Sequence, residues 1–203
     1  MILASGLGRG PPAPSNWTHV APAARPLRAM GPFELRNRLE AAMAEGDGMA
    51  GAHCIHELWM RDGFGVDIDA ALDRLWQHAA SSIPDWLPMT HIEWLPAAYE
   101  ITARFGAARA GRSNVYLILL DYRDRKRGPY GVYVGMSRYA PAQRFDQHKA
   151  GIRAAGSVLK RGLEALTGPT LHLQRMAYAD ATRIESGLAA ALSDAGLLVK
   201  GGH

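Results

Sequence analysis

The stretch PYGVYVGMSRYAPAQRFDQHKAG (residues 129–151) predicts a short apolar strand followed by a helix. The strand carries Tyr133 and Gly135, and Pro141 stands where a helix tolerates proline, in its first turn. Arg144 and His148 follow at a spacing of four residues, so they share one side of that helix. Either packing or catalysis would explain why these four residues lie so close together in the sequence. Features of the rest of the chain are needed to distinguish the two explanations.

A second apolar segment precedes this stretch. NVYLILL (residues 114–120) is apolar on both alternating faces, which is typical of a central strand covered on both sides. The charged turn DYRDRKRGP joins it to YGVYVGM, so the two segments predict a β-hairpin with a long tip. We expect Tyr116 and Tyr133 to lie on the same face of this hairpin.

The rest of the C-terminal half alternates helices with one more strand. After the helix at Pro141 we predict a second helix around SVLKRGLEAL, a third strand in TLHLQRMAY, and a last helix from the N-cap candidate Asp180 to about Gly196. Residues 111–203 therefore predict a compact domain of the α/β (α+β) class. Its expected core is a small three-stranded antiparallel sheet flanked by helices.

Residues 31–110 predict a mainly helical region. A first helix follows Pro32, a second begins at a cap near Asp67 or Asp69, and a third starts around Pro96. The proline-broken segment between the last two predicts an irregular packed connection. The expected buried faces hold Phe33, Leu35, Leu39 and Met43 in the first helix and Ile68, Leu72, Leu75 and Trp76 in the second.

Residues 1–30 contain five prolines and no acidic residue, which predicts a flexible extension. They lack the apolar segment of about 7–15 residues that a secretory signal needs. The scarcity of acids and the presence of arginines leave a transit peptide open as one interpretation. An upstream extension with Met30 as the true start is another.

The composition excludes several classes of protein. No apolar run approaches the ~20 residues that a membrane-spanning helix requires, so we expect no membrane partner. The single cysteine, Cys54, excludes an internal disulfide framework and a cysteine-based zinc site. A reducing, cytoplasmic location is expected.

Charge is distributed unevenly along the chain. Residues 1–110 hold 9 Lys/Arg against 12 Asp/Glu, whereas residues 111–203 hold 14 against 7. A basic half favours a polyanionic partner, although a solvated basic surface is the simpler alternative.

The predicted sheet and the last helix contain further candidate site residues. Gly131 and Gly135 flank Tyr133 on one face and leave room beside its ring. Glu185 lies next to the apolar stripe of the last helix, where a carboxylate is costly unless it is paired or bound to a metal.

Phosphodiester hydrolysis needs groups of these kinds. A divalent cation such as Mg²⁺ can be held by one carboxylate and several waters. Arg144 would offer a planar donor fork to the phosphate. A tyrosine or histidine could orient or deprotonate the water, although a free tyrosine, with a pKa near ~10, is a poor base. Singly these residues are weak indicators, because a strand tyrosine or a helical arginine usually serves packing or the surface.

In order and spacing, this domain resembles the GIY-YIG nucleases over roughly residues 113–201. NVY (114–116) and YVG (133–135) stand where the family has its two tripeptides, RFDQH reproduces its arginine and polar residue, and ATRIESGLAAAL resembles its final helix. The resemblance implies metal-dependent endonuclease activity on DNA, with water as nucleophile and Mg²⁺ or Mn²⁺ as cofactor. By the same resemblance the catalytic residues are Tyr116, Tyr133, Arg144, His148 and Glu185, with Glu185 the metal ligand and Gly135 the structural glycine.

The chain also departs from the family pattern. NVY lacks the first glycine, the hairpin tip is long, and one residue is inserted between Gly135 and Arg144. The asparagine that often follows the glutamate helix is missing, since the chain ends LLVKGGH. A non-catalytic nucleic-acid-binding module that kept the fold is therefore the alternative interpretation.

Basic residues near these motifs predict contacts with nucleic-acid phosphates. They are Arg123, Arg125, Lys126 and Arg127 of the hairpin tip, and Lys149, Arg153, Lys160 and Arg161 beyond it. A solvated turn explains the tip equally well. The sequence does not distinguish DNA from RNA, and cutting both strands of a duplex needs either a homodimer or sequential nicking.

The helical region offers one competing metal candidate. HCIHELW places His53, Cys54, His56 and Glu57 close together, but the spacing matches no standard zinc pattern. We expect the tryptophans of this region, at positions 59, 76, 86 and 94, to form its core.

Overall fold

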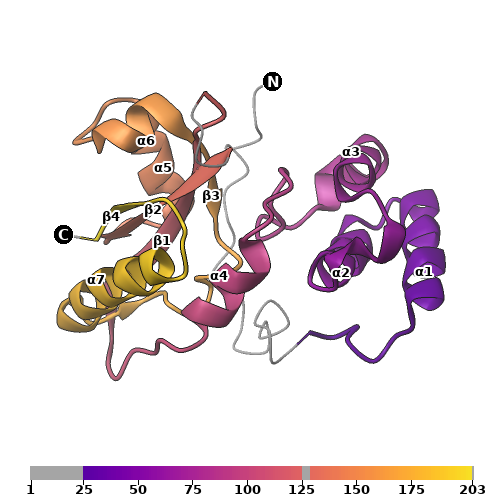
Figure 1. Ribbon diagram of the computed structural model, residues 1–203, viewed down its shortest axis with the longest axis horizontal. Helices are drawn as coiled ribbons and strands as arrows, with labels where there is room; N and C mark the ends of the chain where they lie inside the picture. The colour runs from indigo at the N-terminus through magenta and orange to yellow at the C-terminus, as the bar shows by residue number, and fades with distance from the viewer. Residues whose placement is uncertain (1–24, 125–128, 203) are drawn as a thin grey trace. The chain divides into compact units, whose positions relative to one another are not determined.

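The computed structural model describes residues 25–124 and 129–202, and these form two compact units that divide within one helix (Figure 1). The first unit ends at Pro96, and the second starts at Ala97. This division lies within α4 (Leu95–Thr102), so the residues between Ala97 and residue 110 group with the sheet and not with the helical region. Within the described residues, no helix is both long and apolar enough to cross a membrane.

The first unit is helical, as predicted. Leu35, Leu39 and Met43 are buried on the first helix, and Asp67 caps the third by accepting from the Ala70 N–H at 3.0 Å. Two positions on the expected faces are wrong, since Phe33 is 76% and Trp76 38% exposed. The second helix was not predicted. The helices are α1 (Pro32–Glu45), α2 (Gly48–Trp59) and α3 (Ile68–Ala79), with 3₁₀ turns η3 (Asp62–Gly65) and η4 (Ala80–Ser82).

The second unit is built around a mixed four-stranded sheet in the order β3-β1-β2-β4. The mixed α/β class is confirmed, but the predicted three-stranded antiparallel sheet is wrong, because β4 adds a short parallel strand beside β2. The central strand pairs antiparallel with both β2 and β3. The strands are β1 (Ala110–Asp121), β2 (Tyr130–Ser137), β3 (Gly162–Leu166) and β4 (Val199–Gly201).

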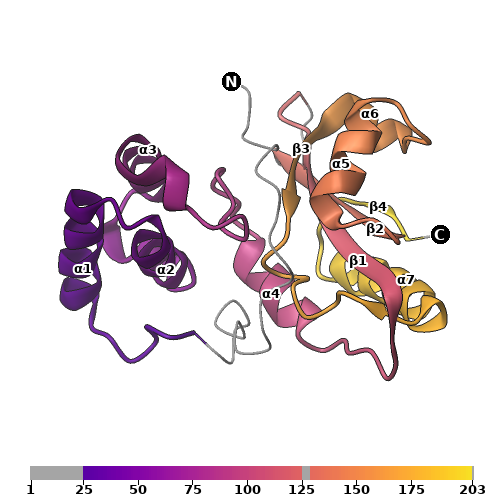
Figure 2. The same ribbon diagram turned by 180° about the vertical axis from the view of Figure 1, so that it is seen from behind.

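Helices cover both faces of this sheet (Figures 1 and 2). On one face lie α5 (Pro141–Lys149) and α6 (Gly156–Arg161), and on the other lies α7 (Tyr178–Asp194). Every residue of β1 from Val115 to Leu120 is buried, which confirms the central strand predicted from its continuous apolar run. Each of its large apolar side chains contributes about 1.5–3 kcal/mol by burial.

The third strand lies earlier in the chain than predicted. The predicted helix over SVLKRGLEAL ends at Arg161, and the residues after it form β3 by pairing with Leu117–Leu120 of β1. The segment TLHLQRMAY, expected as a strand, makes only isolated bridges from Met176 to Ala110 and Ser113. Arg175 in this segment has φ +57°, a left-handed conformation that a regular strand cannot contain.

The last helix begins two residues before the predicted cap. It starts at Tyr178, and the Asp180 carboxylate accepts from the Arg109 N–H at 3.0 Å, so it ties α7 to the start of β1. The helix ends at Asp194, and Gly196 follows with φ +90°, consistent with the predicted stop.

Candidate active site

Tyr116 and Tyr133 lie on one sheet face with Gly135 between them. Tyr116 of β1 pairs with Gly135 of β2, and Tyr133 is two residues earlier on the same face. The two tyrosine rings have centroids 6.2 Å apart. A Cβ at position 135 would lie 2.6 Å from Tyr133 Cε1 and 2.7 Å from Tyr116 Oη. Glycine at 135 is thus a steric requirement of the tyrosine pair.

His148 of α5 reaches the Tyr116 hydroxyl. The distance from His148 Nε2 to Tyr116 Oη is 3.1 Å, and the Ala155 backbone N–H donates to His148 Nδ1 at 3.0 Å. A neutral imidazole carries one N–H, so acceptance at Nδ1 places the hydrogen on Nε2. His148 therefore donates to Tyr116, and a hydrogen bond from Tyr116 in turn acts to lower the pKa of Tyr133.

Burial keeps these groups neutral at physiological pH. His148 is 1% exposed, and burial together with the Arg144 charge lowers its pKa to about 4. Burial raises the pKa of the Tyr116 phenol, Tyr133 raises it further, and Arg144 acts in the opposite direction. The pKa of Tyr133 is raised by burial and by Glu185. Around neutral pH the site thus holds two protonated phenols and an uncharged imidazole.

Arg144 is fixed by the loop that follows its own helix. Its Nη1 donates to Gln147 Oε1 and to the Ile152 carbonyl, both at 3.1 Å, and its Nη2 donates to the Arg153 carbonyl at 2.7 Å. These bonds use three of the five guanidinium hydrogens. The guanidinium also reaches Tyr116, because both its charge and a hydrogen bond from it lower the pKa of that phenol.

Glu185 of α7 supplies the carboxylate of the site. It is 9% exposed, and its charge raises the pKa values of both Tyr116 and Tyr133, so it lies within electrostatic reach of the two phenols. Gly201 of β4 packs closely against this region. A Cβ on Gly201 would lie 2.0 Å from the Val134 carbonyl oxygen and 2.9 Å from Tyr133 Cε2.

Several groups near the site were not predicted. Lys200 of β4 is exposed and pairs in register with Tyr133, so a cation flanks that tyrosine on the site face. The Asn114 amide donates to the Tyr139 carbonyl at 3.0 Å and accepts from the Arg175 N–H at 2.9 Å. Asn114 could have been noticed in the sequence as a polar residue at the start of an apolar strand. The three-residue β4 offers no sequence pattern from which Lys200 could have been found.

The predicted phosphate contacts differ in their surroundings. Arg123 pairs with Asp121, and Lys149 donates to the carbonyls of Leu159 and Gly162 at 3.4 and 3.0 Å. Arg153 and Lys160 are exposed and have no ion pair among the described residues. Arg125, Lys126 and Arg127 lie outside the described residues.

Arg161 is also engaged within the protein. It pairs with Asp124 at 2.6 Å and lies 4.6 Å from the Tyr122 ring centroid. Its guanidinium is therefore less available to a phosphate than the exposed side chains of Arg153 and Lys160.

The residues of the metal candidate HCIHELW are engaged in ion pairs and ring packing. Glu57 pairs with Arg25 and Arg61, and the rings of His53 and His56 pack against Trp86 at 5.1 and 5.7 Å. In the described parts of the chain, no group of three or more His, Cys, Asp or Glu side chains is arranged to hold a metal ion. These residues contribute to the helical core.

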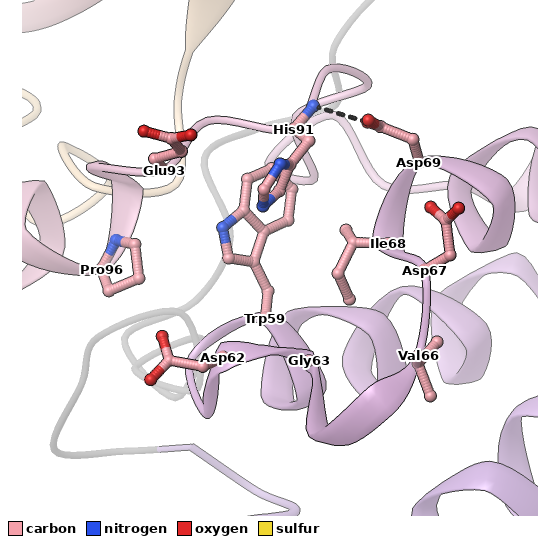
Figure 3. Close-up of a pocket in the computed structure, with 10 residues that line it drawn as sticks. All are labelled: Trp59, Asp62, Gly63, Val66, Asp67, Ile68, Asp69, His91, Glu93 and Pro96. Carbon is pink, nitrogen blue, oxygen red and sulfur yellow. Dashed lines mark hydrogen bonds between the residues drawn. The ribbon is translucent and has the colours of Figure 1, made fainter.

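A pocket of about 390 Å³ lies in the helical unit, and its lining includes the rings of Trp59 and His91, whose centroids are 5.2 Å apart (Figure 3). Asp67 caps α3, and Asp69 accepts from the His91 N–H at 3.1 Å. Acidic side chains dominate its polar lining, a charge that disfavours phosphate binding. The four acidic lining residues are Asp62, Asp67, Asp69 and Glu93.

Comparisons with protein-family models, with curated proteins and with solved structures found no match for this chain.

Proposed function

We propose that the protein is a metal-dependent endonuclease that hydrolyses DNA phosphodiester bonds with water as nucleophile. The observation that carries this proposal is the contact of Tyr116 with both His148 and the guanidinium of Arg144. Tyr133 and Glu185 belong to the same cluster, so β1, β2, α5 and the more distant α7 all contribute to it. The GIY-YIG resemblance of the sequence motifs supports the same reaction.

Arg144 is suited to bind the scissile phosphate. The loop carbonyls hold its guanidinium before substrate arrives, so little side-chain entropy is lost on binding. Its guanidinium can donate to a phosphate oxygen, and its charge stabilises the negative charge that develops on the phosphoryl oxygens.

Tyr116 is suited to orient the attacking water. A phenol has one donor and two acceptor positions, and His148 occupies one acceptor position. Arg144 and Tyr133 are the other hydrogen-bond partners of Tyr116, so a water or a phosphate oxygen would bind Tyr116 by replacing one of them. His148 has both ring nitrogens engaged, so we assign it the positioning of Tyr116 rather than direct contact with the water.

The residues present fit a sparsely bound divalent cation. Glu185 is one nearly buried carboxylate, and the described residues hold no cluster of three ligating side chains beside it. Mg²⁺ commonly binds to one or two carboxylates and keeps several waters, and Mn²⁺ accepts similar oxygen ligands. When bound, such an ion would stabilise negative charge on the phosphate and on the leaving oxygen.

Nicking of supercoiled plasmid tests the proposal. We expect nicking with Mg²⁺ or Mn²⁺, none with EDTA, and loss of nicking in Glu185→Gln. The matched control is Asp194→Asn, which removes an exposed carboxylate from the same helix and should retain activity. Salt-sensitive DNA binding without cutting, on plasmid and on bacterial genomic DNA alike, would instead favour a non-catalytic nucleic-acid-binding module.

A further inference from the structure

Three segments of the second unit meet at one end of the sheet. Residues 112–114 lie near the start of β1, residues 136–139 end β2 and continue beyond it, and residues 175–178 lead into α7. Asn114 pairs with Ser137 across the hairpin, and its side chain binds the backbone of both Tyr139 and Arg175. The Thr182 hydroxyl donates to the Tyr178 carbonyl at 3.0 Å and lies 3.5 Å from Met136 Sδ. These contacts hold the three segments side by side.

The same segments carry aromatic and basic side chains into solvent. Tyr139 is 49% and Tyr178 66% exposed, although both are large aromatic residues that proteins usually bury in part. The three arginines of the segments are exposed, and none has a side-chain ion pair or hydrogen bond among the described residues. The loop patch is defined as Arg112, Arg138, Tyr139, Arg175 and Tyr178.

Three elements link the loop patch to the candidate active site along the chain. Asn114, which holds the patch together, is two residues from Tyr116 on the same strand. Tyr139 is followed directly by Ala140 and the helix that carries Arg144. Tyr178 begins the helix that carries Glu185, about 10 Å along its axis. A strand that crosses the patch can therefore extend into the site.

We propose that the loop patch binds unpaired nucleotides, and that the substrate carries a single-stranded segment next to the bond that is cut. This inference rests on the proposed function and names its substrate class. Arginines alone suffice to bind the phosphates of a duplex. Exposed aromatic rings add stacking, and the face of a base is free to stack only where the base is unpaired and unstacked.

Fluorescence anisotropy in EDTA tests the proposal without any need for cleavage. The probes are a labelled oligothymidylate of about 15 nucleotides and a labelled duplex of equal length. We expect the full chain to bind the single strand more tightly than the duplex at matched salt. Tyr139→Ala and Tyr178→Ala should each weaken single-strand binding about fivefold or more, and the corresponding Tyr→Phe variants should retain it.

Two controls make the result specific to the tyrosines. Leu159→Ala removes an exposed large apolar side chain from α6, outside the patch, and should leave binding unchanged. Binding of the duplex should change less than twofold in the Tyr→Ala variants. Arg138→Gln should weaken both probes and reduce the salt dependence of binding, because it removes a phosphate contact.

Unchanged single-strand binding in the Tyr139→Ala, Tyr178→Ala double variant would overturn the inference, as would a preference for the duplex. The proposed function fails separately. Tyrosine-dependent single-strand binding by a chain that cuts no DNA would support the patch and contradict the endonuclease. Metal-dependent cutting that is unchanged in both tyrosine variants and needs no unpaired segment would support the endonuclease and contradict the patch.

Discussion

His148 Nε2 lies 3.1 Å from Tyr116 Oη, and the Ala155 N–H on the opposite side of the ring fixes which nitrogen carries the hydrogen. The two ring nitrogens of His148 therefore have different functions. Through Nδ1 the histidine satisfies a backbone donor of the loop after α5, and through Nε2 it orients the phenol. A substitution that preserves the first function alone should separate stability from activity.

We expect His148→Asn to do so, because the asparagine Oδ1 can replace Nδ1 as the acceptor for Ala155 but cannot reach Tyr116. Urea unfolding should show little loss of stability in His148→Asn, whereas His148→Ala should lose about 1–3 kcal/mol through the unsatisfied buried N–H. Plasmid nicking should fall in both variants. Full nicking by His148→Asn would show that the Tyr116 contact is dispensable.

The stability of the protein should depend on pH through His148. Its folded pKa of about 4 lies below the ordinary value near 6.5, so the unfolded chain binds the proton more readily between these values. Stability from this group is therefore complete above about pH 6.5 and is lost as the pH falls toward about 4.

Between about pH 7 and pH 5 we expect a loss of about 2 kcal/mol from His148. Burial also lowers the pKa of His172, which adds a loss of the same sign. The difference between the wild type and His148→Asn in urea unfolding at the two pH values isolates the His148 contribution. Equal pH dependence in the two proteins would contradict the lowered pKa.

Gly135→Ala should damage both fold and site. Its methyl group would meet the Tyr116 and Tyr133 rings at distances that no real Cβ contact tolerates, so the tyrosines must move. We expect a loss of about 1–3 kcal/mol in free energy of unfolding and a severe loss of nicking. Gly156→Ala is the matched control, since nothing lies within 4 Å of its added Cβ. Wild-type stability and nicking in Gly135→Ala would contradict the packing described for the site.

Asn114→Ala should loosen three loops at once. The substitution leaves the Tyr139 carbonyl and the Arg175 N–H without their partner, at a cost of about 1–3 kcal/mol for each buried group that water cannot reach. Hydrogen exchange should increase in residues 136–140 and 174–178, while β3 stays protected. Uniformly unchanged exchange would show that the asparagine does not hold the loop patch.

The sequence correctly predicted those helices and strands whose local residue pattern agrees with their tertiary surroundings. The apolar run of β1, the hairpin and the proline at the start of α5 are of this kind, and they place Tyr116, Gly135 and Arg144. β3 is different. GLEAL contains no β-branched or aromatic residue and becomes a strand only because it pairs with β1, whereas the alternating TLHLQRMAY is interrupted by the left-handed backbone of Arg175.

The sequence motifs indicated which residues to expect in the candidate site, but they did not indicate the hydrogen bonds of these residues. The donor to His148 comes from Ala155 in the loop after α5, and the acceptors for Arg144 include the Ile152 and Arg153 carbonyls in that loop. Such backbone partners carry no side-chain signature. Phe33 is a case in which the local pattern predicts the wrong burial. Its helical spacing predicts a buried side chain, but it lies in the first turn of α1 and is largely exposed to solvent.

Arg144→Lys tests whether the geometry of the guanidinium matters beyond its charge. Lysine keeps the positive charge, but its ammonium cannot bind the loop carbonyls and donate to a phosphate with the planar geometry of a guanidinium. We expect nicking to fall by about 10²-fold or more, the scale of losing an oriented donor that acts on developing charge. DNA binding in EDTA should weaken far less, because the net charge is unchanged. Nicking within a few-fold of wild type would mean that Arg144 acts as a point charge only, and its bonds to the Ile152 and Arg153 carbonyls would then serve the loop and not the chemistry.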